Sequence, residues 1–161
     1  MIIRKARIND LEELTKLYLE YDYSLLKITP KNLQIFKKRK KDYKLRIKKN
    51  VEKMLKDKNL ILVCEIDNKL VGSVRGRIIK IENDLFLDKP KLGYLEYLIV
   101  AKEHRGKGIS TQLKNELFKY FKRNKVDTIR LEVIKTNPAI KSYEKWGFKL
   151  DTVKMMKELK D

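Results

Sequence analysis

The residues of this chain best placed to do chemistry form a short turn with two glycines, from His104 to Gly108. The turn directly follows an apolar strand that ends at Val100, and a segment with the pattern of a helix follows it, from Ser110 to Lys122. Backbone N–H groups at a helix N-terminus bind anions, because the helix dipole has its positive end there. Arg105 and Lys107 add formal positive charge. We therefore expect a pyrophosphate to bind here, as part of a phosphorylated cofactor.

Two common phosphate-binding motifs do not fit this turn. A Walker A loop needs Gly, four residues and then Gly-Lys-Ser/Thr, and the chain contains no such string. A dinucleotide fingerprint needs a third glycine where Thr111 stands. Taken alone, the two glycines are equally typical of a tight turn that requires positive φ.

The spacing around the turn is more specific than its glycines. Arg105, Gly108 and Ser110 form a pattern that resembles the acetyl-CoA loop of the GCN5-related N-acetyltransferase (GNAT) family, which is Gln/Arg-x-x-Gly-x-Gly/Ala. The one departure is Ser110, where the family usually has Gly or Ala. Because serine adds only a hydroxyl, we expect the loop to tolerate it.

A second motif appears further along the chain, in the order that the family requires. The run from Asn137 to Phe148 is similar to the family signature Asn-x-x-Ala, three residues, Tyr, three residues, Gly-Phe. Near the N-terminus, Ile3 to Ala6 together with Asp10 is similar to the family's first strand and helix. The resemblance covers nearly the whole chain and is weakest between residues 25 and 58.

The resemblance implies an acetyl-CoA-dependent N-acetyltransferase, which moves an acetyl group to a primary amine by direct attack in a ternary complex. The acceptor would be a protein N-terminus, a lysine or a small amine. In the family the central strand and the next strand splay apart, and the pantetheine arm adds like an extra strand. Main-chain groups of that strand would then bind the arm, and one would polarise the acetyl carbonyl. The implied cofactor-binding residues are Leu98, Ile99, Val100, Arg105, Gly106, Lys107, Gly108, Ile109, Ser110, Asn137 and Tyr143.

Two side chains are the candidates for proton transfer. Tyr143 stands at the family's tyrosine, which donates a proton to the departing thiolate; a phenol of pKa about 10 suits a thiol of about 8.5. The alternative is a core tyrosine. Glu96 is the candidate base, since some family members carry an acid here that is proposed to act through water. Its alternatives are a structural anchor or a solvated edge position, and Tyr97 is a further candidate base. Asn137 is a helix cap, a cofactor contact, or both.

Length and composition limit the other classes of function. A chain of 161 residues and 19.3 kDa predicts one domain over residues 1–161. No apolar stretch approaches the roughly 18–20 residues of a membrane span, and the N-terminus lacks a signal-peptide pattern, so we expect a cytoplasmic protein without a membrane partner. The only cysteine, Cys64, lies in a run typical of a buried strand and suggests a reducing compartment. The only histidine, His104, excludes a His-cluster metal site, and no metal is expected.

The net charge of +18 leaves other partners open. Residues 27–58 contain 14 basic and three acidic residues, a net charge of +11. Such a field attracts polyanions, which favours an acidic acceptor protein or a ribosome. It also keeps two alternatives open, a basic module that binds nucleic acid or ribosomes and a catalytically silent relative that binds acetyl-CoA. A homodimer is among the expectations for the oligomeric state.

The expected fold class is α+β, with a mixed, mostly antiparallel sheet of six to seven strands flanked by about four helices. Strands are predicted at residues 2–7, 60–66, 70–79, 92–100, 128–134 and about 148–156, with a loop at 83–90. The turn residues Asp67, Asn68 and Lys69 predict that the second and third of these strands form a hairpin. Helices are predicted at about 10–23, 110–122 and 138–145, and a strongly basic helix is expected after Thr29 as N-cap and Pro30 as first residue. Its apolar stripe consists of Tyr43, Ile47, Val51, Met54 and Leu55. Acidic residues of the first helix are expected to form a solvated face rather than line an acceptor cleft; they are Glu12, Glu13, Glu20 and Asp22.

Overall fold

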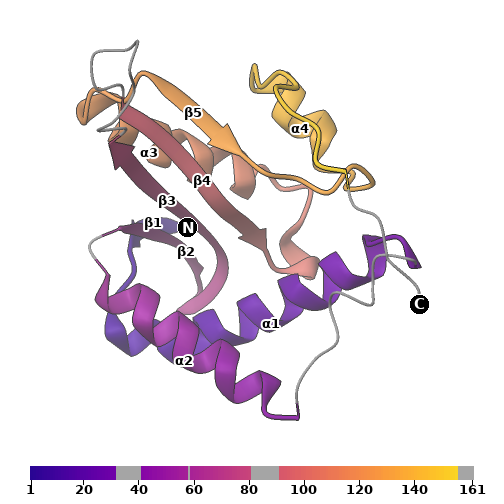
Figure 1. Ribbon diagram of the computed structural model, residues 1–161. Coiled ribbons are helices and arrows are strands. Elements are labelled where there is room, and N and C mark those ends of the chain that lie inside the picture. Colours follow the sequence, from indigo (N-terminus) through magenta and orange to yellow (C-terminus); the bar gives the residue numbers. More distant parts are fainter. Residues whose placement is uncertain (32–40, 58, 81–90, 156–161) are drawn as a thin grey trace.

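The computed structural model describes residues 1–31, 41–57, 59–80 and 91–155 (Figure 1). Within these residues, five strands form one sheet in the order β1-β2-β3-β4-β5. They are β1 (Ile2–Lys5), β2 (Leu60–Ile66), β3 (Lys69–Lys80), β4 (Lys91–Val100) and β5 (Thr128–Leu131). Neighbours from β1 to β4 are antiparallel, whereas β5 runs parallel to β4. The mixed, mostly antiparallel sheet of the predicted α+β class is therefore present.

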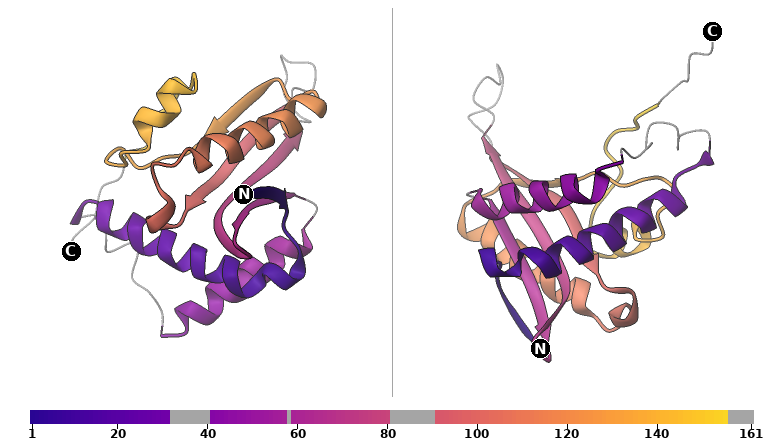
Figure 2. Two further views of the ribbon diagram at one scale, coloured as in Figure 1. Left: turned by 180° about the vertical axis from the view of Figure 1, so that it is seen from behind. Right: turned by 90° about the horizontal axis from the view of Figure 1, so that it is seen from below.

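Helices cover both faces of the sheet. They are α1 (Leu11–Ile28), α2 (Tyr43–Lys56), α3 (Ile109–Arg123) and the short α4 (Ile140–Lys145), with 3-10 turns η1 (Ile8–Asp10) and η3 (Lys102–His104). Helices α1 and α2 lie on one face and α3 on the other, as the views in Figure 2 show. Each face has its own core. Val51 and Met54 of α2 pack with α1 on one face, and Leu113 and Leu117 of α3 fill the other, at the spacing of a single helical stripe.

The hairpin between β2 and β3 forms as predicted. Asp67 and Asn68 both adopt positive φ, 48° and 59°. A two-residue turn of this kind matches the right-handed twist of the strands that it joins, and Asp and Asn tolerate it better than most residues.

A β-bulge in β4 reverses the alternation of its side chains between the two faces of the sheet. Two adjacent residues of β3, Arg75 and Gly76, pair with Tyr97 and Leu95 of β4, so Glu96 is an extra residue in β4. Leu95 packs in the core beneath α3, whereas Tyr97 packs in the core beneath α1 and α2. In a regular strand, residues two apart lie on the same face, and one inserted residue reverses the pattern. The bulge therefore places the side chains of Tyr97 and Ile99 beneath α1 and leaves those of Leu98 and Val100 on the side of α3.

The sheet has five strands in the described residues, rather than six to seven. The strand expected from Phe148 is wrong for residues 148–155, which form no strand. Side chains alone connect this segment to β5 and the residue after it, since Asp151 pairs with Arg130 (3.6 Å) and Lys154 pairs with Glu132 (2.5 Å). The strand pattern of the sequence is thus present without the backbone ladder that a strand requires.

The ends of some helices also differ from expectation. Helix α1 continues to Ile28 instead of ending near Tyr23, and the hydroxyl of Thr29 donates to the carbonyl of Leu25 (2.7 Å). Thr29 therefore closes α1, and the helix start expected after Pro30 lies largely outside the described residues, as does the loop at 83–90. Strand β5 ends at Leu131 instead of reaching Ile134.

A buried carboxylate fixes the start of α1 against the edge of the sheet. Asp10 accepts hydrogen bonds from the Arg4 guanidinium (2.8 and 2.9 Å) and from the backbone N–H of Arg7 (2.7 Å). Arg4 also donates to Glu65 of β2 (2.9 Å). The Arg4 guanidinium, assisted by the Arg7 N–H, holds the pKa of Asp10 below its ordinary value of 3.8.

We predict that Asp10 makes the fold sensitive to acid. A carboxyl whose pKa is lowered by folding stabilises the folded state above its unfolded pKa, and this contribution is lost as the pH falls through the lower folded pKa. The free energy of unfolding of the wild type should thus fall by about 1–2 kcal/mol more than that of Asp10→Asn between pH 6 and pH 2.5, because each pH unit below the unfolded pKa contributes at most about 1.4 kcal/mol. Urea unfolding at each pH measures both, and parallel curves would contradict the assignment.

Candidate active site

The two-glycine turn has the backbone that an anion site requires. Gly106 and Gly108 both have a φ of 77°, and a Cβ on either would meet no atom within 4 Å. Glycine is therefore needed here for its conformation rather than for close packing. Gly108 is the N-cap of α3, so the N–H groups of the first turn of α3 face the same open side. The turn with positive φ and the helix N-terminus lie at the same place. The sequence predicted this whether the glycines serve an anion site or only a tight turn.

The side chains around the turn divide into exposed and buried groups. Lys107 is exposed beside the glycines, and Ser110 is half-buried. Ile109 is buried in the core beneath α3, so only its backbone N–H faces the turn.

Within the described part of the chain, the last part of β4, just before this turn, has no neighbouring strand on the side of β5, and we call this side the open edge. Its pairing with β5 ends at Leu95 and Leu131, while its pairing with β3 continues to Val100. The N–H of Ala101 donates to Val71 of β3 (2.8 Å). Because backbone groups alternate in direction along an antiparallel pair, those of Leu98 and Val100 point away from β3, toward the side that β5 has left.

Not every residue of this stretch faces the open edge. By the same alternation the backbone of Ile99 points toward β3, and its side chain is buried under α1. The carbonyl of Val100 accepts a hydrogen bond from Nε of Arg105 (3.0 Å).

Tyr143 lies on α4 within a group of aromatic side chains. Its ring makes edge contacts with Trp146 (5.7 Å between centroids) and Phe148 (6.1 Å). Gly147 ends the helix with a φ of 88°, which lets the chain turn back and the N–H of Phe148 donate to the Tyr143 carbonyl (3.0 Å). Burial raises the pKa of Tyr143 above its ordinary value, so its hydroxyl carries a proton at neutral pH.

The side chain of Asn137 lies in the turn before α4. Its Oδ1 accepts a hydrogen bond from the N–H of Ala139 (2.9 Å). The N-cap residue of α4 is Ala139 and it has no side-chain cap, so Asn137 closes the turn before the helix rather than capping it, and a contact with a cofactor stays a prediction.

Glu96 lies at the bulge of β4, between two arginines. Its carboxylate forms ion pairs with Arg75 and Arg77, and Arg75 also pairs with Asp57, the residue after α2 (2.9 Å). The Glu96 side chain is 17% exposed. Glu96 is therefore neither a solvated edge residue nor an isolated buried acid. Together with its two arginines and Asp57, it connects β3, β4 and the end of α2.

Tyr97, the further candidate base, lies in the core beneath α1. Its hydroxyl is 3.5 Å from Oγ of Ser73, and its ring contacts that of Tyr18 (4.8 Å). Burial raises the pKa of Tyr97 to about 12, so it is a phenol and not a phenolate at neutral pH.

Comparison with known proteins identifies the family of the chain. A model of the acetyltransferase (GNAT) family matches residues 11–148. The chain belongs to this family. An uncharacterised N-acetyltransferase of Methanocaldococcus jannaschii is 30% identical over 96 residues, which are 59% of this chain and 41% of that protein. The match thus spans about two fifths of the length of this relative.

Solved structures share the GNAT fold over nearly the whole length. A fourfold mutant of a Bacillus halodurans protein has a TM-score of 0.84 at 22% identity, covering 99% of this chain and 100% of that one. An aminoglycoside N-acetyltransferase solved in complex with CoA has a TM-score of 0.69 at 14% identity, covering 99% of this chain and 100% of that one.

The acidic residues of α1 do more than the sequence indicated. Glu12 pairs with Lys48 of α2, and Asp22 accepts a hydrogen bond from the hydroxyl of Tyr43. Glu13 accepts one from the N–H of Leu70 (2.7 Å). Glu20 reaches the turn after β4, where it accepts from the N–H of Lys102 (2.9 Å). All four connect α1 to other elements, although Glu12 stays exposed and the other three are half-buried, so the expected polar face of α1 also carries contacts that the sequence did not predict. No local pattern gives such contacts, because their partners are far away in the sequence.

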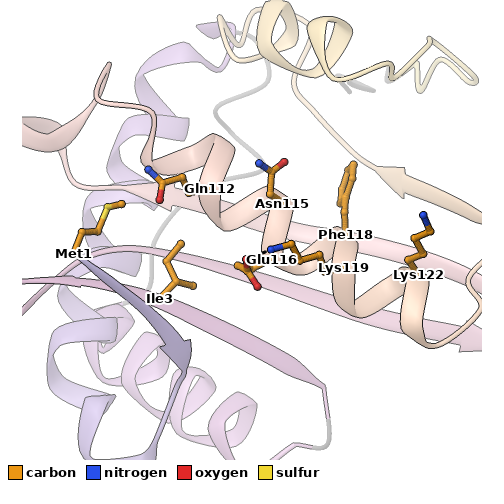
Figure 3. Close-up of a pocket in the computed structure, with 8 residues that line it drawn as sticks. All are labelled: Met1, Ile3, Gln112, Asn115, Glu116, Phe118, Lys119 and Lys122. Carbon is orange, nitrogen blue, oxygen red and sulfur yellow. Dashed lines mark hydrogen bonds and ion pairs between the residues drawn. The ribbon is translucent and has the colours of Figure 1, made fainter.

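A surface groove lies on the other side of this GNAT domain, between β1 and the outer side of α3 (Figure 3). It has a volume of about 710 Å³ and mixed polar and apolar walls. Its lining residues are Met1, Ile3, Gln112, Asn115, Glu116, Phe118, Lys119 and Lys122. None of the predicted site residues lines it.

Other parts of the described chain bear on the remaining expectations. Among the described residues no group of His, Cys, Asp and Glu is arranged to hold a metal ion. Of the helices described, none has the length and apolar character to span a bilayer. Cys64 is fully buried in β2, as its sequence context predicted, and burial raises the pKa of its thiol.

Proposed function

We propose that this GNAT protein is an acetyl-CoA-dependent N-acetyltransferase that acetylates a primary amine by direct attack in a ternary complex. The observation that carries the proposal is the continuity of the open edge of β4 with the two-glycine turn. An extended amide arm that pairs with β4 beyond Leu95 would end at the N-terminus of α3, where a phosphate is favoured.

The proposed cofactor site follows this path. The pantetheine arm lies along Leu98 to Val100, and the pyrophosphate lies on the segment from Arg105 to Ser110, with backbone N–H groups as donors and Lys107 as an exposed cation. Asn137 and Tyr143 border the site from the turn before α4 and from α4 itself. The CoA complex of a structural neighbour with the same fold supports this choice of cofactor.

The proposed reaction needs one acid and one base. The amine nitrogen attacks the acetyl carbonyl carbon, a C–N bond forms, the C–S bond breaks, and the electron pair leaves on sulfur. An N–H group of β4 at the open edge stabilises the oxyanion. The hydroxyl of Tyr143, which burial keeps protonated, donates its proton to the thiolate. The acetylated nitrogen releases one proton to become a neutral amide, and that proton restores the Tyr143 hydroxyl through solvent.

The base makes the amine neutral before attack. For a lysine-like amine of pKa about 10.4, deprotonation at pH 7 costs about 4.6 kcal/mol, but only about 1 kcal/mol for an α-amine. Glu96 is the proposed base, acting through water. Its two arginine partners support the competing role of an anchor for the bulge, so the two roles need a direct test.

The acceptor is proposed to carry acidic groups near its amine. Exposed basic residues cover the outer side of α2; they are Lys44, Arg46, Lys49, Lys53 and Lys56. With a net charge of +18, they favour an acidic protein or a ribosome over a free polyamine. The proposal includes a cytoplasmic location, which the single, unpaired Cys64 supports.

Ligand-dependent thermal unfolding tests the cofactor. Acetyl-CoA at about 100 times its Kd should stabilise the protein by about 2.7 kcal/mol, or about 5–10 °C in Tm. ATP and inorganic pyrophosphate at matched ionic strength are the controls, because a protein of this charge attracts polyanions. Equal shifts with all three ligands would contradict the proposal and favour the nucleic-acid-binding alternative.

Replacing the proposed acid separates an enzyme from a silent relative. Tyr143→Phe should lower kcat about 100-fold and leave the KM for acetyl-CoA within about twofold, because only the proton donor is lost. Tyr120→Phe, at a half-buried tyrosine of α3, is the matched control. An unchanged kcat in Tyr143→Phe would exclude Tyr143 as the acid.

The pH dependence of Glu96→Gln distinguishes a base from an anchor. If Glu96 is the base, this variant loses about 100-fold in kcat/KM at neutral pH, together with the acidic limb of the wild-type profile. Asp57→Asn is the control, since it removes the other carboxylate that pairs with Arg75. If both variants lose activity only in proportion to their loss of stability, Glu96 is an anchor.

A further inference from the structure

One carboxylate of α1 reaches the turn that leads to the proposed cofactor site. Oε1 of Glu20 accepts two hydrogen bonds, from the N–H of Lys102 (2.9 Å) and from Nη2 of Arg105 (3.1 Å). Figure 1 shows α1 passing the end of β4 and the turn after it. Lys102 begins η3, and the first N–H groups of a helical turn have no partner within it. Glu20 therefore satisfies a donor that the turn itself cannot.

Arg105 continues this chain of contacts into β4. While Nη2 bonds Glu20, its Nε donates to the carbonyl of Val100 (3.0 Å). Two donors of one planar guanidinium are thus committed to α1 and to the last residue of β4. The side chain points toward α1 and β4.

We propose that Glu20 and Arg105 form a positioning pair for the cofactor, and that the Arg105 side chain is not a ligand of the phosphate. The inference rests on the proposed function, because it deepens the role of the same site. The pair connects α1, the end of β4 and the entry to the two-glycine turn. It fixes the open edge and the anion-binding N–H groups relative to each other before the ligand arrives.

The effect of removing Glu20 on cofactor affinity distinguishes a positioning pair from an Arg105 that binds the phosphate directly. Glu20 is an anion close to a site for an anion, so by charge alone its removal would strengthen binding of the cofactor. Its removal would also release Arg105, which would strengthen binding further if Arg105 were a phosphate ligand. A positioning pair gives the opposite result, because a site that is ordered in advance binds more tightly than one ordered on binding.

Steady-state kinetics and direct binding of acetyl-CoA test the pair. We expect Glu20→Ala and Arg105→Ala each to raise the Kd and KM for acetyl-CoA about tenfold, with kcat and the KM for the amine within about twofold. In the double variant the Kd and KM for acetyl-CoA should also rise only about tenfold over the wild type, because the two residues act as one unit. Glu20→Gln retains an acceptor for the Lys102 N–H and should recover part of the loss.

Glu13 provides the matched control. It is also a glutamate of α1 that accepts a hydrogen bond from a backbone N–H, that of Leu70 at the start of β3. Glu13→Ala should lower Tm without changing the Kd for acetyl-CoA. Equal effects of Glu13→Ala and Glu20→Ala on this Kd would overturn the proposal, as would tighter binding by Glu20→Ala together with weaker binding by Arg105→Ala.

Amide hydrogen exchange of the ligand-free protein gives a second, independent measurement. The Lys102 amide and its neighbours in η3 should lose about tenfold in protection in Glu20→Ala and none in Glu13→Ala. Unchanged protection in Glu20→Ala would overturn the inference whatever the ligand. If the wild type does not bind acetyl-CoA specifically, the proposed function fails, and the exchange result still decides whether Glu20 orders the turn.

Discussion

The structure depends on how far β4 pairs with each of its two neighbouring strands, β3 and β5. It pairs with β3 up to Val100, but with β5 only as far as Leu95. The bulge at Glu96 lies at the point of divergence, and after it Tyr97 and Ile99 lie in the core under α1, while Leu98 and Val100 pack against the core under α3. Without the bulge, the strand could not both pack on α1 and present the backbone of Leu98 and Val100 on its open side. The ion pairs of Glu96 hold this geometry whether or not the residue also transfers a proton.

Some of this could be predicted from the sequence because the cause is local. Two glycines between an apolar strand and a helix predicted the turn, and each of them has positive φ. Asp67 and Asn68 predicted the hairpin for the same reason. The apolar stripe of α2 and the buried strand around Cys64 also needed only the periodicity of the chain.

Other features depend on partners far away in the sequence. The alternation of β4 gave no sign of a bulge, since it is defined by which residue of β3 faces each position. Glu20 could not be assigned, because its two donors are 82 and 85 residues away along the chain. The segment 148–155 has a strand-like pattern, but a strand also needs a neighbour with backbone groups in register. Sequence reasoning therefore predicted the local conformation of the candidate site better than the long-range contacts that hold it.

The excess of positive charge explains why carboxylates recur at these contacts. The chain has 40 basic and 22 acidic residues, so guanidinium and ammonium groups repel one another unless an acid lies between them. Asp10, Glu20 and Glu96 each lie between two cationic or N–H donors. Each removes repulsion and forms a directional bond at the same time, which a neutral side chain cannot do. These three carboxylates therefore connect separate elements of the fold: Asp10 joins the start of α1 to β1, Glu20 joins α1 to the turn after β4, and Glu96 joins β4 to β3.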